Sequence, residues 1–184
     1  MRKLGIILGS IKEKSSSKSL AKAMLPLFPE SVEASFIRIE DLPLFNPDID
    51  KEGRRPDSYE RFRQTIREQD ALLFITPEYN RTIPAALKNA IEIGSRPYQQ
   101  VAFSGKPAMI ISQSNGSLAG FGANHHLRQS LVFLNVPVMP QPEIYLAHIH
   151  TIVDEQGNFI DSTAAQFLTD SVQDFIDFAK RFES

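Results

Sequence analysis

The chain of 184 residues contains no cysteine, which excludes disulfide bonds, a thiolate nucleophile and a cysteine-ligated metal site. It also has no excess of basic residues, because its net charge is -2 and its isoelectric point is about 6.1. Domains that bind nucleic acid or anionic lipid usually carry such an excess. We therefore expect no nucleic-acid partner.

Long hydrophobic runs are missing as well. No segment approaches the roughly 18 consecutive apolar residues of a membrane span, so no membrane partner is expected. The apolar stretch at residues 4–8 is too short for a signal peptide and runs into Ser10 and Lys12. We expect a soluble, cytoplasmic protein, and the length predicts a single domain over residues 1–184.

Five short apolar segments predict β-strands. Uninterrupted runs such as LGIIL, ALLFI and AMIIS are typical of strands that are buried on both faces, as in a parallel sheet. The segment VEASFIRI alternates more and is expected nearer an edge of the sheet. The predicted strands are 4–8, 32–39, 71–75, 108–112 and 136–139.

Apolar residues at helical spacing predict a helix after each strand. The predicted helices are 19–28, 57–69, 84–93, 122–134 and 163–182. Five alternations of strand and helix, with right-handed crossovers, predict an α/β fold, a doubly wound parallel sheet with helices on both faces. For five strands we expect the flavodoxin-like order 2-1-3-4-5. The segment 39–58 is predicted to be an irregular surface excursion that lines a pocket or an interface.

Ligands of such sheets bind outside the carboxyl ends of the strands, and three of these loops are chemically unusual. The first loop, GSIKEKSSSKSLA, brings hydroxyls and lysines to a helix N-terminus, a pattern that favours a phosphate group. It has neither a G-x-G-x-x-G dinucleotide fingerprint nor a Walker G-K-[ST] loop, so a single phosphate, as on a mononucleotide, suits it better. The alternative is a solvated loop that caps the helix.

The second loop follows the third predicted strand and contains Pro77, Glu78, Tyr79 and Asn80. Proline stiffens the turn, so this loop could present backbone groups to a flat polar edge of a ligand. For Glu78 alone, an ordinary surface carboxylate is the alternative.

The third loop, SQSNGSLAGFG, is rich in serine and glycine, and small residues let the backbone approach a ligand closely. A long flexible turn is the alternative for this loop. The four histidines do not predict a metal site, because the adjacent His125 and His126 point to different sides of a helix. No G-x-S-x-G elbow is present for serine hydrolase chemistry.

At these loops the chain resembles the NAD(P)H-dependent FMN reductases of the flavodoxin-like superfold, which include quinone, chromate and azo-dye reductases. The most specific stretch is PEYNRTIPAALKNAIE, which follows the family pattern P-E-Y-N-x-S/T-x-P-x-x-L-K-N-A-I/L-D/E. It is accompanied, in order, by GSIKEKS, SGKPAMIIS and HLRQSLVFLNVPVMPQPE, so the resemblance covers nearly the whole chain.

The resemblance implies an FMN-dependent oxidoreductase in which the flavin performs the chemistry, with NADPH or NADH as hydride donor and a quinone or similar small molecule as electron acceptor. Tyr79, Arg81 and Asn115 are candidates to line the substrate face of the flavin. By position in the motifs, the resemblance assigns the phosphate to Ser10, Lys12, Ser15, Ser17 and Ser19; the ring edge to Pro77, Glu78, Tyr79 and Asn80; and the pyrimidine end to Ser112, Ser114, Asn115 and Gly116.

Three positions depart from the family pattern. Lys12 stands where arginine is usual, Ser17 where asparagine is frequent, and Ala119 precedes Gly120 where a glycine pair is common. Lysine lacks the bidentate fork of arginine, so weaker phosphate binding is expected.

The resemblance also implies a homodimer or homotetramer, in which Arg128 and Gln129 could pair across an interface; a solvated helix surface is the alternative. Two other functions stay open from the residues. One is a flavodoxin-type electron carrier, although its acidic surface and T-x-T-G-x-T loop are missing here. The other is a flavin-free interaction domain on the same fold.

Overall fold

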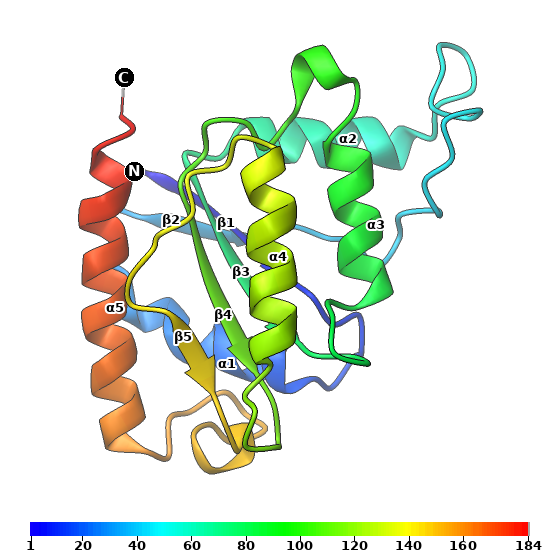
Figure 1. Cartoon of the computed structure of the whole chain (residues 1–184). Coiled ribbons are helices and arrows are strands. Elements are labelled where there is room, and N and C mark those ends of the chain that lie inside the picture. Colours follow the sequence, from blue (N-terminus) through cyan, green and yellow to red (C-terminus); the bar gives the residue numbers. More distant parts are fainter. Residues whose placement is uncertain (184) are drawn as a thin grey trace.

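A computed structural model describes residues 1–183. Strands and helices alternate along the chain (Figure 1). The strands are β1 (Lys3–Leu8), β2 (Glu33–Phe36), β3 (Ala71–Pro77), β4 (Ala108–Gln113) and β5 (Ile144–Leu146). The helices are α1 (Ser16–Met24), α2 (Asp57–Arg67), α3 (Ala85–Gly94), α4 (Phe121–Phe133) and α5 (Ser162–Lys180), with short 3-10 turns η1 (Leu25–Leu27), η2 (Tyr98–Gln100) and η3 (Ile149–Thr151).

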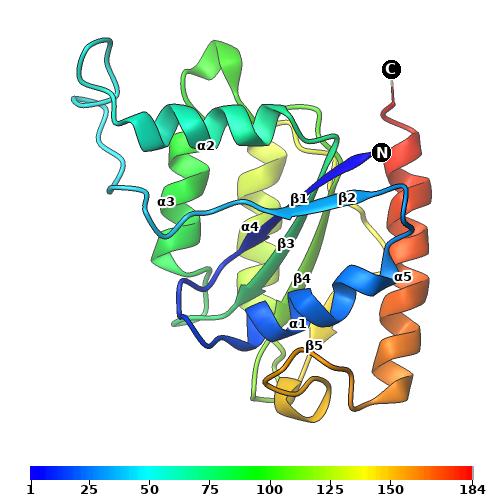
Figure 2. The same ribbon diagram turned by 180° about the vertical axis from the view of Figure 1, so that it is seen from behind.

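The five strands form one parallel sheet in the order β2-β1-β3-β4-β5, which confirms the predicted fold. Helices α1 and α5 cover one face of the sheet, and α2, α3 and α4 cover the other (Figures 1 and 2). Because the strands are parallel, their carboxyl ends lie at the same edge of the sheet, where the loops after β1, β3 and β4 come together.

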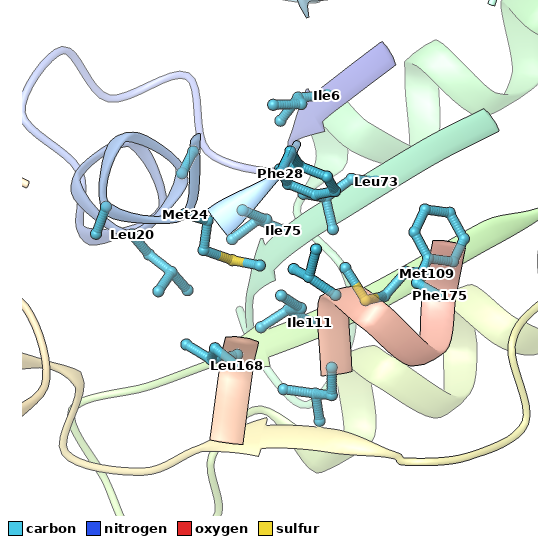
Figure 3. Packing of buried hydrophobic residues seen from close by; sticks show 14 of the residues in the cluster. Ile6, Leu20, Met24, Phe28, Leu73, Ile75, Met109, Ile111, Leu168 and Phe175 are labelled. Carbon is cyan, nitrogen blue, oxygen red and sulfur yellow. The ribbon is translucent and has the colours of Figure 1, made fainter. Parts of the chain in front are cut away.

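The core consists of two layers, one on each face of the sheet. Successive side chains of a strand point to opposite faces, so Leu73 and Ile75 of β3 pack toward α1 and α5, while Leu72 and Phe74 pack toward the other three helices. Figure 3 shows the first layer, in which β3 and β4 side chains meet Met24 of α1 and residues of α5. Each large apolar side chain buried in this way contributes roughly 1.5–3 kcal/mol.

The prediction for the fifth strand is wrong. Residues 137–139 lie beside the start of β4, where Met139 N–H donates to the Ala108 carbonyl at 2.8 Å, but they form only an isolated bridge. Pro137, Pro140 and Pro142 have no N–H to donate, so a regular ladder cannot continue through this segment. Pairing resumes at β5, opposite the carboxyl end of β4.

The remaining boundaries shift by a few residues. β2 is shorter than predicted and lies at the edge of the sheet, as its alternating pattern indicated. α1 begins at Ser16 instead of residue 19, because Ser15 caps it by accepting a hydrogen bond from Lys18 N–H at 3.2 Å.

The predicted surface excursion between β2 and α2 is tied to the helices by buried polar groups. The Arg63 side chain is fully buried and donates to both carboxylate oxygens of Asp50, at 2.9 and 2.5 Å, and to the Ile93 carbonyl. Asn89 of α3 binds the backbone of Phe45 and Pro43. These contacts hold the excursion against α2 and α3.

Candidate active site

The first loop connects β1 to α1 and ends at an open helix N-terminus. Among residues 1–183, no acceptor forms a hydrogen bond with the Ser16 and Ser17 amides, and no acidic residue occupies the first turn of α1. Lys12, Lys14 and Lys18 are exposed around it. Positive side chains at a helix N-terminus are unfavourable, because that end of the helix dipole is itself positive. An anion bound between the lysines and the free amides would remove this repulsion.

The loop is fixed to the rest of the sheet by Gln113, the last residue of β4. Its side-chain amide donates to Ser17 Oγ at 3.0 Å, and its carbonyl accepts from Ser16 Oγ at 3.2 Å. Ser17 and Gln113 are both buried. Gln113 was missed by the sequence analysis, although a polar residue at the end of a buried apolar strand was the signal that identified the second loop.

The second loop is a tight two-residue hairpin at the end of β3. Tyr79 and Thr82 exchange two backbone hydrogen bonds, at 2.9 and 3.0 Å, and the residues between them, Asn80 and Arg81, have φ of 50° and 68°. This geometry corresponds to a type I′ turn. Left-handed backbone at a non-glycine residue is costly, and such strain is concentrated at functional sites. The hairpin exposes half of the Tyr79 side chain.

The Glu78 side chain points away from solvent toward α4. Its carboxylate accepts a hydrogen bond from Ala123 N–H at 3.0 Å and lies 3.5 Å from the Arg81 guanidinium. The Glu78 carboxylate is thus engaged by partners within the chain and is not the solvent-facing carboxylate that the sequence analysis gave as the alternative.

The third loop, after β4, is held from both sides. Ser112 is fully buried and donates from Oγ to the Ala119 carbonyl at 2.9 Å. On the outer side, the ring nitrogens of His148 and His150 contact the backbone and side-chain oxygens of Asn115, at 3.0 and 3.3 Å. The H-x-H pair therefore positions this loop. The structure contains no group of three or more metal-ligating side chains within the described chain.

The three loops enclose one cavity of about 290 Å³. Of the predicted site residues, the cavity is lined by Ser10, Lys12, Ser15, Ser17, Pro77, Glu78, Tyr79, Ser114 and Asn115. Three further residues, Lys14, Ser16 and Gln113, also line it and were missed.

Four predicted residues lie outside this cavity. Ser19 faces the loop after β5 and donates to the Glu155 carbonyl, and Ser112 is buried behind the third loop. Gly116 donates its N–H to Ser114 Oγ. Asn80 lines a neighbouring cavity of about 600 Å³ between α3 and α4. Tyr79 lines both this cavity and the one between the three loops.

The donor set of the cavity fits FMN. Free helix amides, serine hydroxyls and lysine ammonium groups suit a phosphate monoester. At the start of the first loop, Gly9 lets the end of β1 pack closely against β3, because a side chain there would lie 2.5 Å from Thr76 Oγ1. The rigid second and third loops on the far side could grip a flat ring between them.

The family model for NADPH-dependent FMN reductases matches residues 2–151. This chain belongs to that family. An FMN reductase family member is an oxidoreductase that uses FMN with NAD(P)H, so the predicted enzyme class and cofactors are confirmed and the electron carrier and the flavin-free domain are set aside.

Similar proteins agree with this assignment. The chain is 47% identical over 160 residues to a quinone reductase of Pseudomonas putida strain KT2440, covering 87% of this chain and 86% of that protein. It is 37% identical over 166 residues to a 2-hydroxy-1,4-benzoquinone reductase of Burkholderia, covering 90% of each.

Among solved structures, the chain is similar to FerB, a flavoenzyme NAD(P)H:(acceptor) oxidoreductase from Paracoccus denitrificans. The TM-score is 0.90 and the identity 32%, over 99% of each chain. A flavodoxin from Pseudomonas aeruginosa, with a TM-score of 0.58 and 19% identity over 99% of each chain, shares the fold alone.

Proposed function

We propose that this FMN reductase passes electrons from NAD(P)H to quinones, with FMN held in the cavity between the three loops. One observation carries the proposal: the N-terminus of α1, whose first amides are free to bind an anion, lines the same cavity as the polar loops after β3 and β4. Bound FMN supplies a carrier that takes a hydride from NAD(P)H and returns the electrons to an acceptor. Relatives named as quinone reductases support a quinone acceptor.

The residues of the chain bind and orient the reactants. We assign the phosphate to the Ser16 and Ser17 amides with Lys12 and Lys14, which line the cavity. Apart from the Glu78 side chain, which is engaged by Ala123 and Arg81, the predicted flavin ligands that line the cavity keep their assignment. Ser19, Ser112 and Gly116 are proposed to act by shaping the loops.

The acceptor is proposed to lie against Tyr79, Arg81 and Asn115. Tyr79 is 51% exposed at the edge of the cavity and offers a flat apolar face with a hydroxyl. The Arg81 side chain is 73% exposed beside it. A positive charge there favours an acceptor that gains negative charge on reduction, as a quinone does.

We further propose that the protein is a homodimer or homotetramer and acts in the cytoplasm. Two of the N–H donors of Arg128 bind within the chain, to the Asn124 side chain and the Met139 carbonyl. Exposed Val132 and Phe133 at the end of α4 are better candidates for subunit contact. Light scattering of the purified protein tests the assembly, and a monomer at micromolar concentration would contradict it. Within residues 1–183, no helix is both long and apolar enough to cross a membrane.

Steady-state kinetics with NADPH tests the choice of acceptor. The proposal predicts a higher kcat/KM for 1,4-benzoquinone than for free FMN or an azo dye, and a rise in the quinone KM for Arg81→Ala with little change in the KM for NADPH. A Lys51→Ala variant, changed on the exposed excursion far from the cavity, serves as control. If quinone is the poorest acceptor, or if Arg81→Ala leaves every kinetic constant unchanged, the assignment is wrong.

A further inference from the structure

Helix α4 begins without a cap of its own. Its N-cap residue is Gly120, which provides no side chain, and the first turn contains no acidic residue. The N–H groups of a first helical turn have no partner within the helix, and a negative charge next to them is stabilising. The start of α4 therefore needs an acceptor from another part of the chain.

Glu78 of the second loop provides this acceptor. Its Oε2 accepts from Ala123 N–H at 3.0 Å, across 45 residues of sequence, and its side chain is only 12% exposed. The other carboxylate oxygen lies 3.5 Å from the Arg81 guanidinium, on the same hairpin. Both oxygens are engaged, one by α4 and one by the hairpin.

Gly122 allows the two segments to approach this closely. A side chain at this position would lie 2.7 Å from the Arg81 carbonyl oxygen and 2.9 Å from Glu78 Oε2. Contacts under 3.0 Å force one partner to shift, and here the nearest partner is backbone. The hairpin and the first turn of α4 thus fit together with no space between them.

We propose that Glu78 is a positioning residue, which fixes the spacing of the second and third loops by capping α4 and does not touch the flavin with its carboxylate. The third loop runs directly into α4, so a bond from the second loop to the first turn of α4 sets how far apart the two loops stand. This inference rests on the proposed FMN site, because the loops that it spaces are the ones proposed to grip the ring.

Three variants test the proposal. Glu78→Ala removes the acceptor, and Glu78→Gln keeps an oxygen that can accept from Ala123 N–H but removes the charge. Gly122→Ala keeps the carboxylate and separates the two segments. The matched control is Asp161→Ala, because Asp161 caps α5 by accepting from Thr163 and Ala164 N–H and lies in none of the site loops.

The Kd for FMN, measured by fluorescence titration of the apoprotein, is the main readout. We expect Glu78→Ala to raise the Kd roughly tenfold, as the loss of one charge-assisted hydrogen bond would, and Gly122→Ala to raise it similarly. Glu78→Gln should stay within about threefold of the wild type, because a neutral acceptor preserves most of the bond. Asp161→Ala should lower thermal stability without changing the Kd.

Hydrogen exchange of the apoprotein gives a second readout that needs no flavin. Amides at the start of α4 should exchange faster in Glu78→Ala and at the wild-type rate in Asp161→Ala. The proposal is overturned if Glu78→Ala binds FMN as the wild type does, if Glu78→Gln is as weak as Glu78→Ala, or if Asp161→Ala weakens FMN equally. A wild-type protein that binds no FMN refutes the proposed function instead, whatever the exchange data show.

Discussion

Lys12 is the residue at which this FMN reductase departs most clearly from its family. It lines the cavity beside the open N-terminus of α1 and forms no ion pair among residues 1–183. A lysine offers a point charge to a phosphate, whereas arginine offers two parallel N–H donors. At the scale of one side chain we therefore expect Lys12 to hold the phosphate by charge more than by geometry.

Lys12→Arg should therefore tighten FMN binding several-fold and make it less sensitive to salt, because a bidentate hydrogen-bonded pair depends less on screened Coulomb attraction. Fluorescence titrations of FMN at two salt concentrations measure both effects. Lys51→Arg is the matched control on the exposed excursion and should change neither. A Kd for Lys12→Arg that equals or exceeds that of the wild type would show that Lys12 does not contact the phosphate.

Most residues that line the cavity were predicted from the motifs that follow the strands, but their hydrogen-bond partners were not. Proline, tyrosine and asparagine directly after a buried strand identify a ligand loop from sequence alone. That Glu78 bonds to Ala123, or Ser17 to Gln113, depends on which loops the sheet brings together. Contacts between residues so far apart in the sequence leave no periodic signal, so the sequence alone did not show what the Glu78 carboxylate binds.

At the scale of elements, α4 and the loop before it depend on left-handed backbone at two successive residues. Ala119 has φ of 53° and Gly120 has φ of 73°. A side chain at position 120 would lie 3.0 Å from Ser112 Cβ. This position therefore requires glycine both for conformation and for space.

Gly120→Ala should lower the free energy of unfolding by about 2 kcal/mol, from left-handed strain of roughly 1–2 kcal/mol plus the close contact, and should weaken FMN binding because the third loop shifts. Gly105→Ala is the matched control: its φ is 76°, but nothing lies within 4 Å of the added carbon. That variant should lose only the strain term, with no effect on FMN. Urea unfolding and FMN titration of both variants measure the difference, and equal effects would contradict it.

The strands that the sequence predicted best are those with the least polar character. β1, β3 and β4 are buried along most of their length, so their uninterrupted apolar runs identified them within two residues. The fifth strand was misplaced because residues 136–139 are apolar and do lie beside β4, whereas the true β5 has only three residues. An apolar sequence indicates that a segment is buried, but not that it pairs as a strand. Strand pairing also needs backbone N–H groups, and the prolines in and after residues 136–139 have none.

At the scale of the whole molecule, stability depends on a buried ion pair that anchors the long excursion. Hydrogen bonding to Arg63 lowers the pKa of the Asp50 carboxyl below its ordinary value, against the effect of burial, and Arg55 adds to the decrease. Because the pKa is lower in the folded state, the ionised carboxylate stabilises the fold at neutral pH. This contribution is lost as the pH falls below the unfolded value, near 3.8, and through the folded one.

Asp50→Asn should lower the free energy of unfolding at pH 7 by about 3 kcal/mol, since it leaves the Arg63 charge buried without its counter-ion. The difference from the wild type should begin to shrink as the pH falls below 3.8, the ordinary pKa at which the carboxyl of the unfolded chain is protonated, and should be smallest below the lowered pKa of the folded state. Asp48→Asn, whose carboxylate meets only the exposed Lys51, is the control and should change little. Urea unfolding of both proteins across this pH range measures the difference in free energy of unfolding. A difference that stays constant with pH would contradict a stabilising role for the ionised Asp50 carboxylate.

The central claim is that the three loops hold FMN for the transfer of electrons from NAD(P)H to a quinone. The measurement that tests it most directly is the visible absorption of the purified protein after addition of FMN and gel filtration, followed without oxygen by NADPH and then by 1,4-benzoquinone. We predict that FMN stays with the protein, that its visible absorption bleaches with NADPH, and that the quinone restores it. A protein that retains no FMN, or FMN that neither bleaches nor recovers, would contradict the account.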